Sequence, residues 1–232
     1  MYRLFVSLLF FVTLYSHAQL TRDTILQVDD TSYLEDQFYI GVTYNLLLNR
    51  PTDIAQRNLS YGLQVGFIRD IPLNTRRTIA FGVGLGYAIN SYYSNLGVNE
   101  STNGFEYTML DSDTNFKRNK LETHVMEMPL EFRWRNSTTN SYKFWRIYTG
   151  VRGEYVMGRR SKFVPDDGNK ISFNNTDIRR FQYGLTLNFG YNTFNIHTYY
   201  SLTGLFNDDV STVNGEAIEV RPLRIGIIFY IL

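Results

Sequence analysis

The sequence predicts an all-β protein: an eight-stranded antiparallel up-and-down transmembrane β-barrel with a polar, filled lumen. Three features indicate this. Apolar and polar side chains alternate at successive positions, long and short connections alternate along the chain, and aromatic residues make up 16% of it. A period of two is typical of strands, because successive side chains point to opposite faces. Short alternating strands rich in aromatic residues are typical of outer-membrane barrels.

Residues 1–18 have the features of a secretory signal peptide. Arg3 precedes an apolar run over residues 4–15, and Ser16 and Ala18 place small residues at the usual cleavage positions. The run is too short for a transmembrane helix, which needs about 20 apolar residues. We therefore expect export across the inner membrane and cleavage after residue 18.

The rest of the chain is long enough for one sizeable domain, since β-barrels of about 200 to 250 residues are ordinary single domains. We expect residues 19–36 to form a polar periplasmic lead-in and residues 37–232 to form the barrel. The chain has no cysteine, which excludes disulfides, thiolate metal sites and a cysteine nucleophile. Its net charge of +1 gives no reason to expect a nucleic-acid partner.

The first three predicted strands show the alternation in different forms. Residues 37–48 alternate bulky apolar side chains with polar residues or glycine, and residues 60–70 place four apolar side chains on one face. Residues 78–93 set bulky side chains against a stripe of glycine and alanine. These alternating glycines superficially resemble a phosphate-binding loop. Their position inside a strand, with no helix following, instead indicates a face packed against bulky neighbours.

The fourth and fifth strands, residues 121–135 and 143–159, have the clearest pattern. Even positions are apolar and odd positions charged in the first, and the reverse holds in the second. The last three strands, residues 179–190, 194–205 and 219–232, again carry an apolar residue at every second position. Each strand thus has one apolar face and one face of polar or small residues.

A soluble β-sandwich would show the same alternation of apolar and polar side chains, so the lengths of the connections have to distinguish it from a membrane barrel. They run long, short, long, short, long, short, long, as in outer-membrane barrels with short periplasmic turns and longer external loops. With eight strands, the chain begins and ends the barrel on the same side, so both termini of the barrel are predicted to be periplasmic. The segment 105–116, within the longest external connection, is predicted either as a small external hairpin or as a loop.

The strands must close into a ring, because an unpaired edge in hydrocarbon leaves amide and carbonyl groups without partners. A ring of eight is only wide enough for side chains to fill its interior. We expect Gln64, Tyr148 and Asn188 inside it. The predicted structural charge cluster of the lumen consists of Glu127, Glu131, Arg133, Arg146, Arg152, Glu154, Arg180 and Arg224.

The two charged strands can be placed in register. If both charged faces point inward, paired residue numbers sum to an odd value. A turn centred between residues 139 and 140 then sets Glu127 opposite Arg152 and Arg133 near Arg146. Opposite charges facing each other neutralise one another in a poorly hydrated lumen. Removing Glu127 alone is therefore expected to destabilise the barrel more than removing it together with Arg152.

Some eight-stranded barrels are lipid A deacylases or palmitoyl transferases, and a serine hydrolase would need a histidine beside a nucleophile and an orienting carboxylate. His124 lies on the apolar face near the external end of its strand, with Glu122 two positions away, but no motif places a serine beside it. A single histidine at such a position is more often structural. His197 shares the inward face with Tyr199 and is expected to form hydrogen bonds in the lumen. We predict no enzymatic activity and no catalytic residues.

Metal and cofactor sites are not predicted either. The two histidines outside the signal segment are far apart, and without cysteine they offer no zinc-ligand spacing. Paired aspartates in the predicted external loops could hold Ca²⁺, but solvated loop charge is the ordinary interpretation. No cofactor, metal or small-molecule substrate is expected.

Several segments resemble the PorT family of outer-membrane barrels and its gliding-bacterium counterpart SprT. They are MEMPLEFRWR (residues 126–135), KFWRIYTGVRGEYVMGRRSKF (143–163), FQYGLTLNFGYNTFNIHTYYSL (181–202) and IGIIFYIL (225–232). The FRWR and FWRIYTG blocks look most specific to this family. Residues 19–120 resemble it only in their barrel pattern.

The resemblance implies an accessory component of the type IX secretion system, acting through protein–protein contact, and a role in gliding motility where that occurs. The expected partners are outer-membrane lipid, lipopolysaccharide and other secretion subunits. Two alternatives stay open. One is a structural or adhesive barrel of the OmpX type, and the other is a lipid A-modifying enzyme.

Overall fold

A computed structural model describes residues 36–56, 58–102, 104–110, 114–136 and 144–231. The predicted signal peptide and nearly all of the predicted lead-in lie outside these residues. Within them no helical segment is long and apolar enough to cross a membrane. The strands are β1 (Asp36–Leu48), β2 (Tyr61–Pro72), β3 (Ile79–Tyr93), β4 (Leu96–Ser101), β5 (Gly104–Met109), β6 (Phe116–Arg135), β7 (Trp145–Pro165), β8 (Ile171–Asn174), β9 (Phe181–Tyr191), β10 (Phe194–Ser201) and β11 (Arg221–Ile231).

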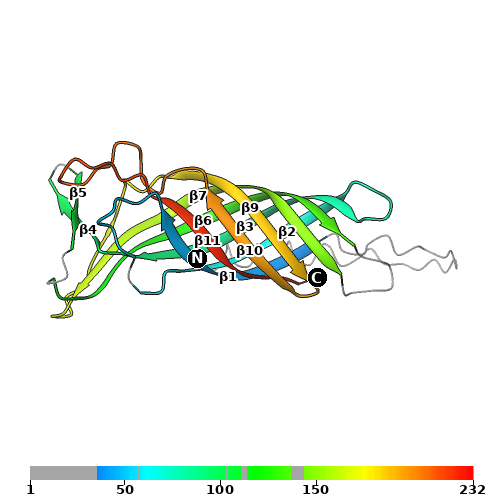
Figure 1. Cartoon of the computed structure of the whole chain (residues 1–232), viewed down its shortest axis with the longest axis horizontal. Helices are drawn as coiled ribbons and strands as arrows, with labels where there is room; N and C mark the ends of the chain where they lie inside the picture. Colours follow the sequence, from blue (N-terminus) through cyan, green and yellow to red (C-terminus); the bar gives the residue numbers. More distant parts are fainter. Residues whose placement is uncertain (1–35, 57, 103, 111–113, 137–143, 232) are drawn as a thin grey trace, which may run out of the picture. The chain divides into compact units, whose positions relative to one another are not determined.

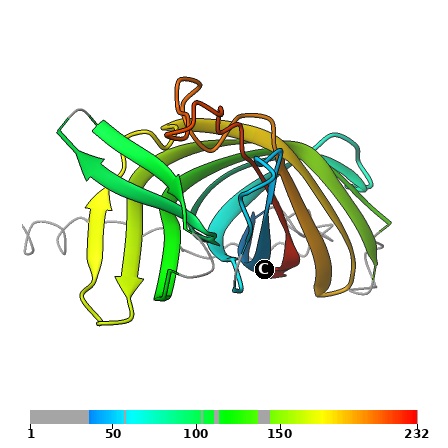
Figure 2. The same cartoon turned by 60° about the vertical axis from the view of Figure 1, so that its left-hand side comes forward.

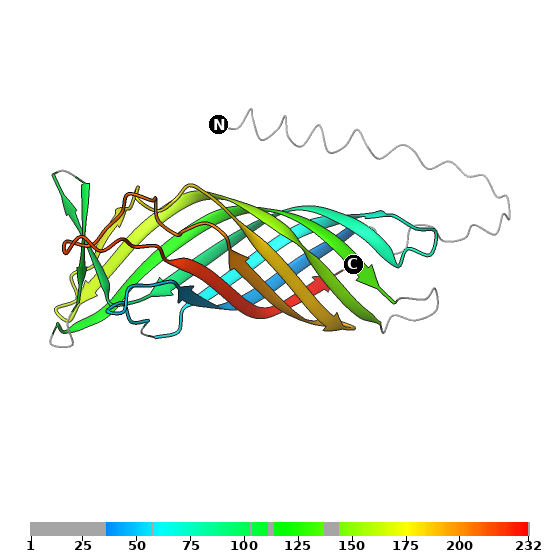
Figure 3. The same ribbon diagram turned by 45° about the horizontal axis from the view of Figure 1, so that its top comes forward.

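Eight of these strands form a closed antiparallel barrel, which confirms the predicted fold class. The ring runs β1-β2-β3-β6-β7-β9-β10-β11, and it closes because β1 pairs with both β2 and β11. The strands lie at a marked tilt to the long axis of the barrel (Figure 3). Every neighbour in the ring is also the next barrel strand in sequence, so the topology is up-and-down.

The two ends of the barrel differ in their connections. We call the end that carries the β2–β3, β6–β7 and β9–β10 connections the short-turn end, and the other the long-loop end. The β4–β5 hairpin lies at the long-loop end, whereas the C-terminal end of β11 lies toward the short-turn end (Figure 1). The predicted alternation of loop lengths is therefore present in the structure.

The long-loop end contains more regular structure than the sequence predicted. The small hairpin expected around residues 105–116 is formed by β4 and β5, residues 96–109, so it begins nine residues earlier. The strands β6 and β7 extend beyond the barrel, where β7 also pairs with the short strand β8 (Figure 2). The strand β8 was not predicted, because its four residues are too few to show a period.

The register between β6 and β7 differs by two residues from the predicted one. Glu127 lies opposite Glu154, and not opposite Arg152 as predicted; Arg133 lies opposite Tyr148. The numbers of paired residues sum to an odd value, as expected, but this sum is larger by two than the predicted one. The turn residues 137–143, on which the prediction rested, are outside the described part of the chain. Face and parity were predictable from alternation, whereas the register depends on the turn.

The outward face of the barrel is apolar and has aromatic residues at both ends. Trp145, at the short-turn end, packs against Phe189 and Tyr191 with ring centroids 5.2 and 5.0 Å apart. Tyr155 and Phe181 form a similar pair toward the long-loop end, at 5.0 Å. Outward aromatic girdles of this kind suit the two interfaces of a bilayer.

The interior has an apolar cap at the long-loop end and a polar middle. The cap is a buried cluster of side chains from barrel strands and from the long connections: Leu47, Ile54, Ala88, Tyr92, Leu96, Val98, Tyr107, Leu121, Val125, Val156, Ile178, Leu205, Phe206, Val210, Ile218 and Val220. A smaller cluster lies among the interior charges, formed by Tyr39, Ile68, Tyr148, Ile228 and Tyr230. The lumen is thus filled by side chains.

Candidate functional site: the charged lumen

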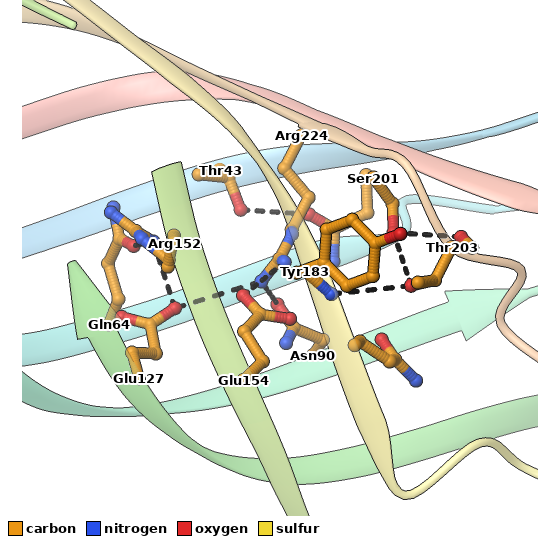
Figure 4. A network of polar contacts seen from close by, with 12 residues as sticks. Thr43, Gln64, Asn90, Glu127, Arg152, Glu154, Tyr183, Ser201, Thr203 and Arg224 are labelled. Atoms are coloured by element: carbon orange, nitrogen blue, oxygen red, sulfur yellow. Dashed lines mark hydrogen bonds and ion pairs between the residues drawn. The ribbon is translucent and has the colours of Figure 1, made fainter. Parts of the chain in front are cut away.

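Glu127 on β6 joins two arginines of the interior network, Arg152 and Arg224 (Figure 4). Its carboxylate accepts a hydrogen bond from Arg152 Nη1 at 2.9 Å and one from the Tyr39 hydroxyl at 3.2 Å. Arg224 Nη1 lies 3.8 Å away. Glu127 is fully buried, so this carboxylate is stabilised by its cationic neighbours and not by bulk water.

A second ion pair lies beside it. Glu154 on β7 and Arg224 on β11 are bonded, and Arg224 Nη1 also donates to the Asn90 side chain at 3.3 Å. The Arg224 guanidinium stacks over the ring of Tyr199 at 3.8 Å from the centroid. Planar guanidinium groups suit this combination of ion pairing and stacking.

The third group lies toward the short-turn end and centres on Asp70. One carboxylate oxygen of Asp70 is bonded to Arg133 Nη1, and the other accepts a hydrogen bond from Arg135 Nη1 at 2.6 Å. Arg133 Nη2 also donates to Gln37 Oε1 at 2.9 Å, and its guanidinium lies 3.8 Å from the centre of the Tyr148 ring. Asp70 thus neutralises part of a strongly cationic layer.

Glu131, His197 and Arg146 complete the interior set. Asn188 Nδ2 donates to Glu131 at 3.2 Å, and Asn188 Oδ1 lies 2.5 Å from His197 Nδ1. Arg146 stacks over Phe144 at 4.6 Å from the ring centre. His197 therefore lies in the lumen hydrogen-bond network, on the inward face as expected.

Most of these contacts join strands that are not neighbours in the sheet. Tyr39 on β1 reaches β6, and Arg152 on β7 donates across the lumen to Gln64 on β2 at 2.8 Å. Arg224 on β11 reaches Glu154 on β7, two strands beyond its own neighbour β10. The charged side chains brace the barrel through its centre, in addition to the hydrogen bonds around its wall.

The structure brings together seven of the eight predicted cluster residues. Glu127, Glu131, Arg133, Arg146, Arg152, Glu154 and Arg224 are all buried in the interior. Arg180 is a correction. It is exposed, and it donates to the Tyr155 hydroxyl on the outward face at 2.9 Å. Arg180 precedes the first residue of β9, so strand parity does not govern its direction.

The predicted contact between Glu127 and Arg152 exists, although the two residues are diagonal and not directly opposite. The shift of two residues places Arg152 opposite Pro129, and the long arginine side chain reaches back to Glu127. Arg133 does not pair with Arg146 in a neutralising way, since both are cations and Arg133 is held by Asp70.

Asp70 and Gln37 are the main interior residues that the predicted cluster omitted. Asp70 was placed at the end of its predicted strand, where alternation is least certain. Its parity matches Gln64, which was expected inside, and this signal could have identified it. Gln37 likewise shares the face of Tyr39 at the beginning of β1.

The loops of the cap are tied to one another by polar contacts as well. The Tyr107 hydroxyl on β5 donates to Asp177 at 3.0 Å and accepts from Asn175 Nδ2 at 3.0 Å. Burial raises the pKa of Tyr107 far above its usual value, so the hydroxyl stays protonated as a donor. The β4–β5 hairpin is thereby fixed to the β8–β9 connection.

The catalytic candidate His124 lies on the outward face as predicted and has Glu122 beside it, but its other ring nitrogen faces a tyrosine hydroxyl and not a serine. Its Nδ1 is 2.6 Å from the Tyr87 hydroxyl, and its Nε2 is 3.5 Å from Glu122 Oε1. Ser91, on the neighbouring strand, instead contacts Lys120 Nζ at 3.3 Å. Among the described residues no group of histidine, aspartate and glutamate side chains has the arrangement of a metal site.

Comparison with known proteins gives one family. The family model described as outer membrane protein beta-barrel domain matches residues 17–207, which is most of the chain. A search of curated proteins gave no match.

Proposed function

Because the chain belongs to the outer membrane protein β-barrel domain family, we propose that it serves in that membrane as a non-enzymatic accessory component of type IX protein secretion. The finer assignment rests on the PorT-like segments of β6 and β7. The observation that supports an accessory role is the filled lumen, since a ring of eight strands occupied by buried arginines and carboxylates has no room for a translocating protein. The protein then acts by contact, and another subunit forms the pore.

The cap at the long-loop end is the surface that we assign to this contact. Its loops are packed on a common apolar cluster and are fixed by the Tyr107 hydrogen bonds, so they present a preorganised surface. We place this end outside the cell and the short-turn end in the periplasm, following the usual loop lengths of such barrels. The N-terminus and the C-terminus of the barrel domain are then both periplasmic.

Deleting the gene and measuring secretion of proteins with a C-terminal sorting domain tests the proposal. We expect these proteins to accumulate in the periplasm and secretion to return with the wild-type chain. A chain carrying Glu100→Lys and Glu106→Lys, two exposed residues of the β4–β5 hairpin, should insert normally but restore secretion poorly. Arg69→Glu with Arg76→Glu, exposed at the short-turn end, is the matched control for this surface.

Normal secretion in the deletion strain would refute the role in secretion. If envelope integrity changed at the same time, a structural barrel would be the better description. A changed lipid A mass profile in a His124→Ala strain would instead indicate a lipid-modifying enzyme. Equal secretion by the hairpin variant and its control would remove the cap as the contact surface.

A further inference from the structure

A cluster of cations lies on the outward face of β6 and β7, next to the apolar belt. The even positions of β6 are apolar from Trp134 to Met126, and the next even positions toward the long-loop end are His124, Glu122, Lys120 and Arg118. The outward face therefore changes from apolar to charged over four residues, from Met126 to Glu122. In a bilayer this transition falls where the hydrocarbon ends and the lipid headgroups begin.

A β-bulge adds two more cations to the same face. The pairing of β7 with β6 shifts by one residue between Val156 and Gly158. Odd positions of β7 point outward before the shift, as exposed Met157 does, whereas even positions point outward after it. The bulge thereby places Arg160 opposite Glu122 and Lys162 opposite Lys120. Re-aiming of side chains is a known use of bulges.

Glu122 holds the two lysines side by side. Its Oε2 accepts from Lys120 Nζ at 2.6 Å, and its Oε1 is bonded to Lys162 Nζ. Like charges directly opposite one another in a sheet are destabilising, so the carboxylate compensates for a close cation pair. Each ammonium has three donors; Lys162 donates to Glu122, whereas Lys120 donates to both Glu122 and Ser91. The exposed Arg118 and Arg160 leave this group with an excess of positive charge.

An apolar groove lies on the same outward face, next to this group. It has a volume of about 410 Å³ and crosses β1, β2, β3, β6 and β7. Tyr87 and Met126 form the part of its lining nearest the charged residues, since Tyr87 is also bonded to His124. The groove and the cations together match a molecule with an anionic headgroup and an apolar chain. The lining residues are Phe38, Val65, Gly66, Phe67, Leu85, Gly86, Tyr87, Met126 and Met157.

We propose that Arg118, Arg160 and Lys162 bind the phosphate of an outer-leaflet glycolipid of the lipid A type, with the buried Lys120 adding positive charge beside them and an acyl chain in the adjacent groove. Lysine and arginine donors bind phosphate oxygens through charge-assisted hydrogen bonds. The site requires the long-loop end to face outward, so it rests on the orientation given under the proposed function. It does not require a role in secretion.

The test uses the full-length chain refolded in detergent and native mass spectrometry of its complexes. The probes are bis-phosphorylated lipid A, the same lipid with its phosphates removed, and inorganic phosphate as competitor. We expect the wild-type chain to bind the phosphorylated lipid at least tenfold more tightly than the dephosphorylated one. Millimolar inorganic phosphate should weaken that binding only partly, because it lacks the acyl chain.

Two variants separate loss of the site from loss of folding. Arg118→Gln with Arg160→Gln removes only exposed charges and should weaken lipid A binding about tenfold or more. A triple variant, Lys120→Gln with Glu122→Gln and Lys162→Gln, removes the lysine pair and its carboxylate together, so it leaves no unpaired charge and should weaken binding further. The control is Arg69→Gln with Arg76→Gln, which removes two exposed arginines at the short-turn end.

Equal lipid A affinity in the wild-type chain and both variants would overturn the proposal. So would equal affinity for phosphorylated and dephosphorylated lipid, which would reduce the site to the apolar groove. Inorganic phosphate binding as tightly as lipid A would identify free phosphate as the ligand and would also refute a lipid site. These measurements are independent of secretion, so failure of the secretion role leaves them interpretable.

Discussion

Removing Glu127 is expected to destabilise the barrel more than removing Glu127 and Arg152 together. In a Glu127→Leu chain, Arg152 stays buried with only Gln64 as a bonded partner, and the Tyr39 hydroxyl loses its acceptor. Breaking a buried ion pair from one side costs about 3 to 5 kcal/mol, because an uncompensated charge is left behind. We therefore expect the single variant to lose about 4 kcal/mol of unfolding free energy.

The double variant, Glu127→Leu with Arg152→Met, leaves no uncompensated charge from this pair. The remaining cost is the unsatisfied Tyr39 hydroxyl, about 1 to 3 kcal/mol, together with the weaker contact to Arg224 at 3.8 Å. We expect a loss of about 2 kcal/mol. The difference between the two variants, about 2 kcal/mol in favour of the double variant, is the quantity to measure.

Urea unfolding of the chain refolded in lipid vesicles measures these differences. Trp134 and Trp145 are outward at the short-turn end and report loss of the apolar surroundings through their fluorescence. The control is the exposed pair of Asp36 and Arg69, 3.9 Å apart, whose removal should cost less than about 1 kcal/mol and show no coupling. If the Glu127 double variant is as unstable as the single one, the ion pair does not dominate this site.

Three further expectations concern the wall, the corrected cluster and the cap. Gly150→Ala should prevent barrel formation, because the added Cβ would lie 2.0 Å from the Leu130 carbonyl oxygen. Gly153→Ala should be tolerated, since the atom nearest to its Cβ lies 3.8 Å away. Heat-modifiable gel migration distinguishes folded from unfolded barrels, and normal migration of both variants would contradict the close approach at Gly150. Arg180→Gln should cost less than about 1 kcal/mol in urea unfolding and Arg224→Gln about 3 to 5 kcal/mol, so equal losses would place Arg180 back among the buried charges. Tyr107→Phe removes the hydroxyl that bonds Asp177, so amide hydrogen exchange in β5 should become about tenfold faster or more, while exchange in the barrel strands stays the same. Unchanged exchange in β5 would mean that the hydrogen bonds of the Tyr107 hydroxyl do not fix the hairpin.

Much of the barrel was predictable because it follows from side-chain alternation. The hydrocarbon surroundings require an apolar outward face, and strand geometry converts this into a period of two that can be read directly from sequence. Strand number, closure, and the inward face of Glu127, Arg152 and Arg224 all follow. The predicted signal peptide and its cleavage lie outside the described residues and stay predictions.

The parts that were not predictable depend on single residues that alternation does not specify. The β6–β7 register depends on a turn whose geometry the sequence does not announce. The bulge at Val156 and Met157 changes the parity of β7, so Arg160 and Lys162 point outward although the pattern of the preceding residues would place them inside. Arg180 departs from its expected face because it precedes the strand. Each difference arises at the end or interruption of a regular strand.

The interior network also explains how a filled lumen can matter for a protein that acts through its loops. A wall hydrogen bond fixes only neighbouring strands, whereas Tyr39 to Glu127, Arg152 to Gln64 and Glu154 to Arg224 fix strands on different sides of the ring. The strands β1, β2, β6, β7 and β11 all carry or border the long connections of the cap. Their relative positions at the long-loop end are therefore set partly by charges in the middle of the barrel. Loss of one interior charge should consequently disturb the shape of the cap as well as the stability of the wall.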